Sequence, residues 1–123
     1  MISLEKALEI HSILIEQFGG GNGLRDSELL ESALGKPYQS FDNQELYQTP
    51  IEKAAAIMES IVKNHPFVDG NKRTGYVLGR LLLMNSGMDI HASEDEKYEF
   101  VIKISEGRID YDEIKGWLNE KSC

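Results

Sequence analysis

Helix-start signals divide the sequence, and they constrain its fold more than any other feature. Short polar residues that can cap a helix each precede a stretch in which apolar side chains recur at three- and four-residue spacings; they are Ser3, Asp26, Thr49, Ser93 and Asp110. Such side chains accept hydrogen bonds from the free N–H groups of a first helical turn. The pattern predicts an all-α fold in which amphipathic helices bury their apolar stripes against one another.

The apolar stripes also predict where the first helices begin and end. One stripe covers residues 4–18 and stops at a glycine-rich segment, residues 19–23, since glycine favours helix ends and tight loops. We interpret this segment as a structural loop, because it follows a helix and lacks the G-x-G-x-x-G spacing of a dinucleotide-binding loop. A short helix through residues 29–34 should end at Gly35 and Pro37.

Three capping residues are followed three positions later by glutamate, which predicts capping boxes; the pairs are Thr49 with Glu52, Ser93 with Glu96 and Asp110 with Glu113. The first of these helices should end at His65, because Pro66 follows. Residues 76–84 are apolar on most faces, which predicts a central buried helix. With 123 residues, the chain should form a single domain, residues 1–123, as a compact bundle of about six helices.

Two segments fall outside this helical pattern. Residues 38–48, a polar and aromatic stretch, have no regular spacing and form the longest irregular region; loops of this length are often functional flaps or mobile segments. Residues 88–92 alternate weakly, as a short strand would, but no other segment offers a partner of comparable strength.

The charge balance excludes several classes of partner. The chain has 13 Lys and Arg against 21 Asp and Glu, a net charge of −8, which argues against nucleic acid because phosphate contacts supply most non-specific binding. No apolar run approaches the roughly 18 residues of a membrane-spanning helix, and we expect no secretory signal in MISLEKALEI. The single Cys123 cannot form an internal disulfide, which fits a cytoplasmic protein without a membrane partner.

One segment departs from this acidic average. Residues 61–80 carry a net charge of +3, whereas residues 89–113 carry −6. The basic segment coincides with a predicted helix start, where free backbone N–H groups and the helix dipole attract anions. We therefore expect a phosphate-binding site formed by Gly70, Asn71, Lys72 and Arg73.

Two further side chains border this predicted phosphate site. Asp69 precedes it, and Mg²⁺ is usually held by one or two carboxylates together with substrate phosphates and water, so Asp69 is a candidate metal ligand. His65 lies four residues upstream and is the residue type that exchanges protons near neutral pH. A base, a carboxylate and a phosphate site together predict group transfer from a nucleotide.

The sequence lacks the residue spacing of several other functional motifs. A Walker A loop would require glycine at position 65 and lysine at position 71. No histidine or cysteine spacing supports zinc, and nothing suggests a serine or cysteine triad. His11 and His91 are expected to be structural. Asp69-Gly70-Asn71 by itself would be an ordinary turn, and only the clustering of these residues favours a functional site.

The segment HPFVDGNKRT, residues 65–74, resembles the signature of the Fic/Doc superfamily, H-x-F-x-[D/E]-[G/A]-N-[G/K]-R. Residues 20–26, GGNGLRD, approximate a segment that precedes the signature in the death-on-curing (Doc) branch. The resemblance implies the helical Fic/Doc fold, in which the motif loop leads into a central buried helix. It also implies that His65 is the general base, that Asp69 binds Mg²⁺, and that residues 70–73 form the phosphate cradle.

Two departures from the Fic pattern point to the Doc branch. Fic adenylyltransferases have glycine where this chain has Lys72, and a second arginine where it has Tyr76; Arg80, one turn further, is a candidate substitute. Resemblance to Doc implies transfer of the γ-phosphate of ATP to a serine or threonine hydroxyl of a protein, the known target class being elongation factor Tu. Residues 38–48 would then receive the target segment.

Proteins of this kind are toxins of toxin–antitoxin pairs, so the resemblance also implies a small antitoxin whose C-terminal helix lies near the active site. Some relatives carry an inhibitory [S/T]-x-x-x-E-[G/N] helix instead, and Ser12-x-x-x-Glu16-Gln17 fails this pattern at its last position. Two alternatives stay open. The chain could be a protein adenylyltransferase, or an inactive binding module that keeps the fold.

Overall fold

The computed structural model describes all 123 residues and confirms the all-α prediction of about six helices. The helices are α1 (Leu4–Phe18), α2 (Ser27–Gly35), α3 (Pro50–Asn64), α4 (Asn71–Met84), α5 (Glu94–Ser105) and α6 (Tyr111–Lys121). A 3₁₀ helix, η1 (Lys36–Tyr38), and two short strands, β1 (Ser40–Phe41) and β2 (Gln44–Glu45), lie between α2 and α3. None of the helices is both long and apolar enough to cross a membrane.

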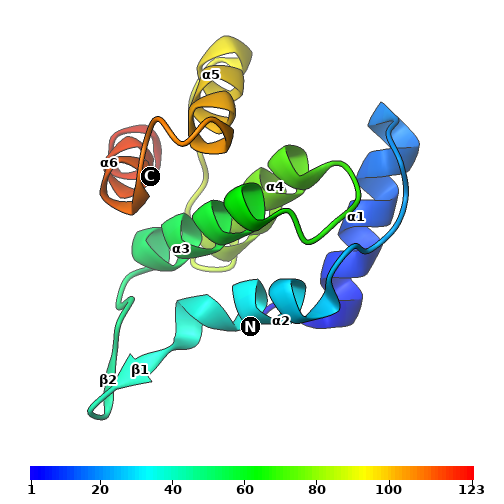
Figure 1. Cartoon of the computed structure of the whole chain (residues 1–123). Coiled ribbons are helices and arrows are strands. Elements are labelled where there is room, and N and C mark those ends of the chain that lie inside the picture. Colours follow the sequence, from blue (N-terminus) through cyan, green and yellow to red (C-terminus); the bar gives the residue numbers. More distant parts are fainter.

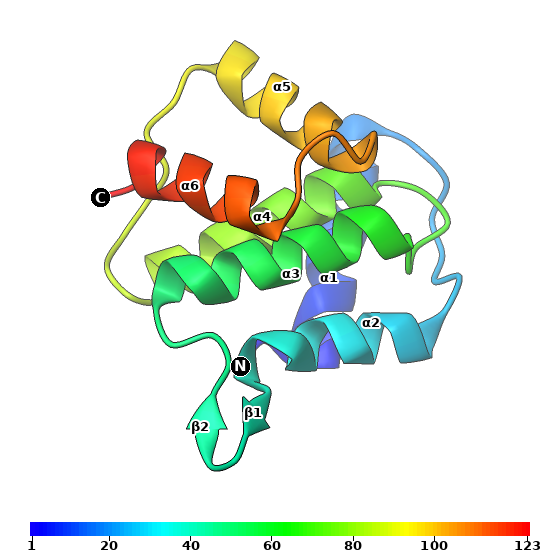
Figure 2. The ribbon, with the colours of Figure 1, turned by 60° about the vertical axis from the view of Figure 1, so that its left-hand side comes forward.

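Helices α3 and α4 form the centre of the bundle, with α1 and α2 on one side and α5 and α6 on the other (Figures 1 and 2). Two glycines let the central pair approach closely. A Cβ atom on Gly75 would lie 2.8 Å from Cγ2 of Val62, and one on Gly79 would lie 2.4 Å from Cε of Met58. The Asn71–Met84 helix is therefore central, as predicted, and its glycines are required by the packing.

The core has two halves that share α3 and α4. One half packs beneath α1 and α2 and includes Leu30, Ile61, Phe67 and Leu78. The other packs beneath α5 and α6; among its members are Met58, Leu83, Phe100, Ile104 and Leu118. Both halves bury apolar stripes that the spacing predicted, and the motif loop is anchored in the first half by Phe67.

All five predicted helix caps are confirmed, because each side chain accepts a hydrogen bond from a first-turn N–H group. The reciprocal bond of a capping box is present at Thr49 with Glu52 and at Ser93 with Glu96. The box predicted for Asp110 and Glu113 is wrong, since only the Asp110 side chain bonds the Glu113 backbone. The Glu113 carboxylate lines a groove instead.

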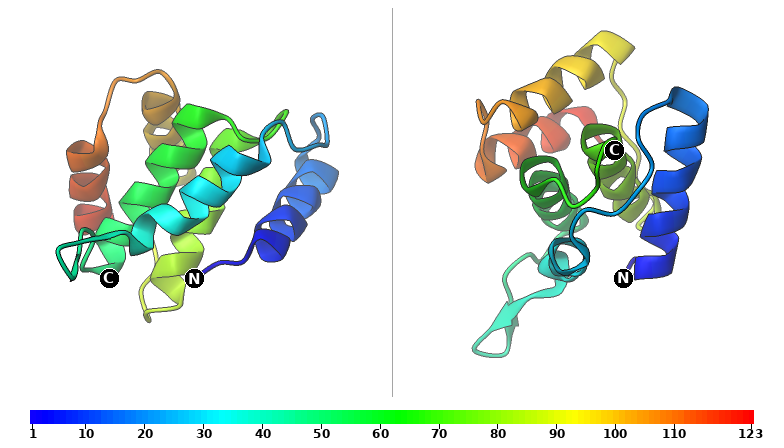
Figure 3. Two further views of the ribbon diagram at one scale, coloured as in Figure 1. Left: turned by 60° about the horizontal axis from the view of Figure 1, so that its bottom comes forward. Right: turned by 45° about the vertical axis from the view of Figure 1, so that its right-hand side comes forward.

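The two non-helical segments differ from expectation. Residues 38–48 contain a hairpin in which Phe41 pairs with Gln44, closed by Asp42 and Asn43 at φ 53° and 64°, a conformation typical of two-residue hairpin turns. The hairpin projects from the helical body (Figure 3). The weak strand at residues 88–92 does have a partner, since Ile90 forms a bridge with Ser122. A single bridge leaves too little periodicity to detect from sequence.

Candidate active site

The motif loop connects α3 to α4, and one buried side chain closes it. The Asn71 amide donates from Nδ2 to the Phe67 carbonyl at 2.9 Å and accepts at Oδ1 from the Phe67 N–H at 2.9 Å. Phe67 is itself only 1% exposed. His65 ends α3 in the left-handed conformation, at φ 50°, and its side chain is exposed. The loop therefore turns sharply around a fixed Phe67 while the His65 ring faces solvent.

The glycine-rich loop lies against the motif loop, as the ribbon shows in two views (Figures 1 and 2). Gly21 N donates to Oδ2 of Asp69 at 3.1 Å, and Val68 N donates to the Gly23 carbonyl at 3.0 Å. Gly20 has φ +115°, and a Cβ there would come within 2.8 Å of Oδ2 of Asp69. The interpretation as a structural loop is confirmed, and its role is to hold Asp69.

Arg25 strengthens the same junction. Its guanidinium donates from Nε to the His65 carbonyl at 2.7 Å and from Nη2 to the Asn64 carbonyl at 2.8 Å. These carbonyls belong to the end of α3, where helical partners are missing. The backbone N–H groups of Arg25 and Asp26 both donate to the Pro66 carbonyl. The GGNGLRD segment thus fixes the backbone around His65 through hydrogen bonds to the carbonyls of residues 64–66.

His11 contacts the motif loop from α1, a role that sequence reasoning missed. It is 2% exposed, its Nε2 lies 2.8 Å from the Asp69 carbonyl oxygen, and its ring stacks on Phe67 with centroids 3.8 Å apart. Because a carbonyl only accepts, Nε2 is the donor in this bond. The structural role expected of His11 is confirmed by its burial. Its position on the apolar stripe of residues 4–18 was the only available signal.

A cavity of about 690 Å³ lies beside the motif loop, between α1, α4 and α5. It brings all six predicted site residues together: His65, Asp69, Gly70, Asn71, Lys72 and Arg73. Apart from Val68 of the motif loop, its remaining lining comes from α1, α4 and α5 and includes Phe18, Tyr76 and Tyr98. The predicted residues thus share a single enclosure with room for a small-molecule ligand.

The start of α4 has the features of a phosphate site. Gly70 occupies the N-cap at φ +77° and offers no side chain to the first-turn N–H groups, which have no helical partners. Lys72 and Arg73 are exposed beside them, and the Arg73 guanidinium lies 4.1 Å from the centroid of the Phe18 ring. The Asn71 side chain bonds Phe67 through both Oδ1 and Nδ2, which fixes its orientation, and its backbone N–H is one of the free first-turn groups.

Asp69 carries an exposed carboxylate that is oriented by backbone groups. Hydrogen bonds from the N–H of Gly21 and then of Gly70 hold the pKa of Asp69 below its ordinary value, so it is ionised at neutral pH. Each oxygen keeps a lone pair after accepting one bond. No three metal-ligating side chains gather anywhere in the chain. The donor set therefore fits Mg²⁺ only where phosphate oxygens and water complete the coordination.

Tyr76, one of the two positions that separate the branches, and Arg80, the candidate substitute for the second arginine, also line the cavity. The Arg80 guanidinium binds both carboxylate oxygens of Asp89, through Nε at 2.7 Å and through Nη2 at 2.9 Å. Tyr76 is half-buried, and burial raises its pKa to about 12, so its hydroxyl stays neutral. That hydroxyl has no hydrogen-bond partner within the protein. The candidate substitute for a second arginine is thus engaged in an ion pair.

Comparisons with known proteins agree with this geometry. The sequence model of the Fic/DOC family matches residues 1–83, which include α1 to α3 and most of α4. Toxin Doc of Mycolicibacterium smegmatis is 36% identical over 78 residues, or 63% of this chain and 60% of that protein. Protein kinase doc of Escherichia phage P1 is 27% identical over 94 residues, or 76% of this chain and 74% of that protein. The chain belongs to the Fic/DOC family.

Proposed function

We propose that this chain is a Doc-type toxin that transfers the γ-phosphate of ATP to a serine or threonine hydroxyl of a protein target. The observation that carries the proposal is the shared cavity. It places an exposed histidine, an ionised carboxylate and an uncapped, basic helix start along one wall. Phosphoryl transfer requires mainly positioning and charge stabilisation, and this wall supplies both.

Each predicted residue has a role that its surroundings support. The first-turn N–H groups of α4 bind phosphate oxygens, and Lys72 and Arg73 neutralise their charge. His65 accepts the proton of the target hydroxyl. The hydroxyl oxygen forms a bond to the γ-phosphorus, the bond from that phosphorus to the bridging oxygen breaks, and ADP leaves with the bond's electrons. The exposed His65 ring can meet a target that approaches from solvent.

Asp69 would hold Mg²⁺ in this site. A bound Mg²⁺ would supply positive charge that stabilises the charged phosphate groups. The protein's own contribution is to fix the carboxylate, through the N–H groups of Gly21 and Gly70, and to keep it ionised.

Two observations favour γ-phosphate transfer over the runner-up reaction, transfer of AMP. Tyr76 replaces the second arginine of the Fic pattern, and Arg80, the candidate substitute, is held in an ion pair with Asp89. Lys72 adds a charge where Fic enzymes have glycine. One relative is named a protein kinase. An inactive binding module is the least favoured alternative, because all six candidate site residues line one cavity.

We also propose two protein partners on the basis of family resemblance and the relatives' names. The target is elongation factor Tu or a similar protein, which the projecting hairpin at residues 40–45 would contact. The second partner is a small antitoxin. A helix of that antitoxin would cover the cavity along its apolar wall between α1 and α5, which includes Leu14, Val77 and Val101.

The proposal is tested by incubating the protein with elongation factor Tu, ATP and Mg²⁺ and then measuring the intact mass of the factor. We expect the mass to increase by one phosphoryl group. His65→Ala should abolish the increase, whereas His91→Ala, at an exposed histidine outside the cavity, should not. An increase by an AMP group would establish the runner-up instead. An unchanged mass with folded protein would contradict both.

A further inference from the structure

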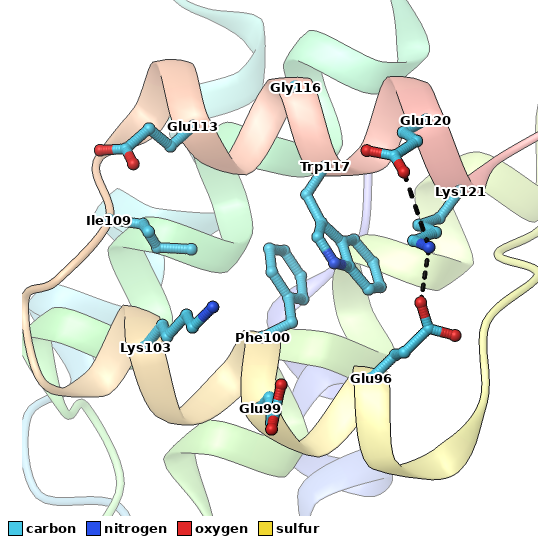
Figure 4. A pocket seen from close by; sticks show the side chains of 10 residues that line it. All are labelled: Glu96, Glu99, Phe100, Lys103, Ile109, Glu113, Gly116, Trp117, Glu120 and Lys121. Atoms are coloured by element: carbon cyan, nitrogen blue, oxygen red, sulfur yellow. Dashed lines mark hydrogen bonds and ion pairs between the residues drawn. The ribbon is translucent and has the colours of Figure 1, made fainter.

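A second concave surface lies between α5 and α6, with a volume of about 460 Å³ (Figure 4). It shares no lining residue with the candidate active site. Helix α5 separates the two, since Lys97, Tyr98 and Val101 face the active site, whereas Glu99, Phe100 and Lys103 face this groove. The groove also lies beyond residues 1–83, which match the family. The phosphate-transfer proposal therefore does not account for it.

The floor of the groove is aromatic. Phe100 is 2% exposed, and the Trp117 ring stacks on it with centroids 3.9 Å apart and planes at 5°. Trp117 is half-buried, and Figure 4 shows its indole extending from α6 toward α5 across the groove. Gly116 leaves the adjoining wall bare, because a Cβ there would meet nothing within 4 Å. Glycine inside a helix costs about 1 kcal/mol relative to alanine, so local stability does not explain its presence.

The rim of the groove is acidic. Glu96 and Glu120 both pair with Lys121, at 2.5 and 3.7 Å, so that cation is already neutralised. Glu99 and Glu113 line the groove without any ion-pair partner. Lys103 is the single lining cation without an ion pair. Four carboxylates against two ammonium groups leave the lining with a net negative charge, and residues 94–121 as a whole carry nine acids and five bases.

We propose that this groove binds a basic, partly apolar peptide segment of another protein. An arginine or lysine of that segment would stack on Trp117, since cations are attracted to indole faces. Neighbouring basic side chains would pair with Glu99 and Glu113, and apolar ones would cover the aromatic floor.

Size and charge disfavour two other occupants, a folded domain and a second copy of this chain. The lining is ten residues, fewer than the roughly 20–30 on each side of a stable interface between folded domains, which favours a short segment. A symmetric contact with a second copy would place the same acidic rims opposite each other. Like charges facing each other disfavour such a contact.

The experiment uses intrinsic fluorescence, because Trp117 is the single tryptophan of the chain. The probe is a short synthetic peptide in which arginine and leucine alternate, and its counterpart has glutamate in place of arginine. We expect the arginine peptide to change Trp117 emission saturably and to bind more weakly as salt rises. The glutamate peptide should cause no change.

Variants establish where the arginine peptide binds. The double variant Glu99→Lys/Glu113→Lys should bind it roughly tenfold more weakly, as expected when attraction becomes repulsion. The matched control is Asp112→Lys, which reverses a charge in the same first turn of α6 but outside the groove, and should bind like the wild type. Lys103→Gln removes the unpaired cation and should bind the arginine peptide more tightly. This variant tests the proposal even if the double variant does not fold.

Three results would overturn the proposal. One is equal binding of the arginine peptide to the wild type and the double variant when both are folded by circular dichroism. Another is weaker binding of the arginine peptide by Lys103→Gln, which would show that repulsion by Lys103 does not oppose binding and that the acidic rim does not control it. The last is a concentration-dependent dimer in sedimentation that alters Trp117 emission without peptide, which would assign the groove to a second copy.

Discussion

The motif loop and the α5–α6 pair are held in place by different means. The motif loop is held mostly through its backbone. His11 and Arg25 come from distant segments and bind the Asp69 carbonyl and the end of α3, and Asn71, at the end of the loop itself, binds Phe67. The α5–α6 pair instead relies on side chains, namely the Phe100–Trp117 stack and the ion pair of Lys121 with Glu96. A site for group transfer needs a fixed backbone, because small displacements of reacting groups cost rate. A surface that only binds a partner can be held in place by side-chain contacts.

The same two regions differ in charge, which is how an acidic chain could hold the nucleotide that we propose. Residues 61–80 carry +3, whereas residues 94–121 carry −4. The overall charge of −8 argues against polyanions such as nucleic acid. It does not exclude one small anion at the start of a helix. The two regions are therefore suited to partners of opposite charge.

Asn71→Ala should have the largest effect on stability and activity, because it acts on the motif loop. The substitution leaves the N–H and carbonyl of buried Phe67 without partners, so we expect the free energy of unfolding to fall by about 2–4 kcal/mol. Transfer activity should be lost with it. Urea denaturation measures the first effect. Asn119→Ala, at an exposed position of α6, is the control and should change stability little. Equal stability of the two variants would show that the loop does not depend on this amide.

His11→Ala should have the next largest effect. It removes the donor to the Asp69 carbonyl and the ring stacked on Phe67, so we expect a loss of about 1–3 kcal/mol of stability together with a lower kcat. His11→Gln can still donate a hydrogen bond and should recover part of the kcat. Steady-state kinetics alongside denaturation separate the two effects. If both variants kept the wild-type kcat, His11 would serve only in packing.

Two glycine-to-alanine changes compare the regions directly. Gly20→Ala places a Cβ 2.8 Å from Oδ2 of Asp69 at φ +115°, and should destabilise the protein by about 1–2 kcal/mol and raise the Mg²⁺ concentration needed for transfer. Gly116→Ala meets nothing within 4 Å in α6, and should stabilise by about 0.5–1 kcal/mol. Thermal denaturation gives the sign of each change. Destabilisation by Gly116→Ala would mean that its surroundings are tighter than described.

Acid should slightly destabilise the α5–α6 pair by protonating Glu96. Hydrogen bonds from Lys121 and from Ser93 lower the pKa of Glu96 from its ordinary 4.5 to about 2. Because the folded pKa is depressed, the stabilisation is complete above about pH 4.5 and is lost as the pH falls toward 2. Glu96→Gln should remove this component from the pH dependence of stability. Trp117 emission during acid titration measures it, and identical titrations of both proteins would contradict it.

Local signals were enough to predict the helices and to select the residues of the candidate site. The caps at Ser3 and Thr49 act within three residues, and the motif residues 65–74 are contiguous, so both can be found in the sequence. Every predicted site residue then lines one cavity.

The contacts that position the site could not be predicted, because they join distant segments. Gly21 and Asp69 are 48 residues apart, and His11 and Asp69 are 58 residues apart. The bridge between Ile90 and Ser122 is equally non-local. A local pattern can also mislead. Asp110 and Glu113 have the spacing of a capping box, yet the Glu113 side chain does not bond the Asp110 backbone. The groove between α5 and α6 depends on how two helices pack and has no motif of its own.

The most direct test of the central claim compares label transfer from two forms of ATP. Elongation factor Tu is incubated with the folded protein and Mg²⁺, once with γ-labelled ATP and once with α-labelled ATP. The account predicts label on the factor from the γ form alone, reduced about 100-fold or more by His65→Ala. Label from the α form, or undiminished transfer by His65→Ala, would contradict it.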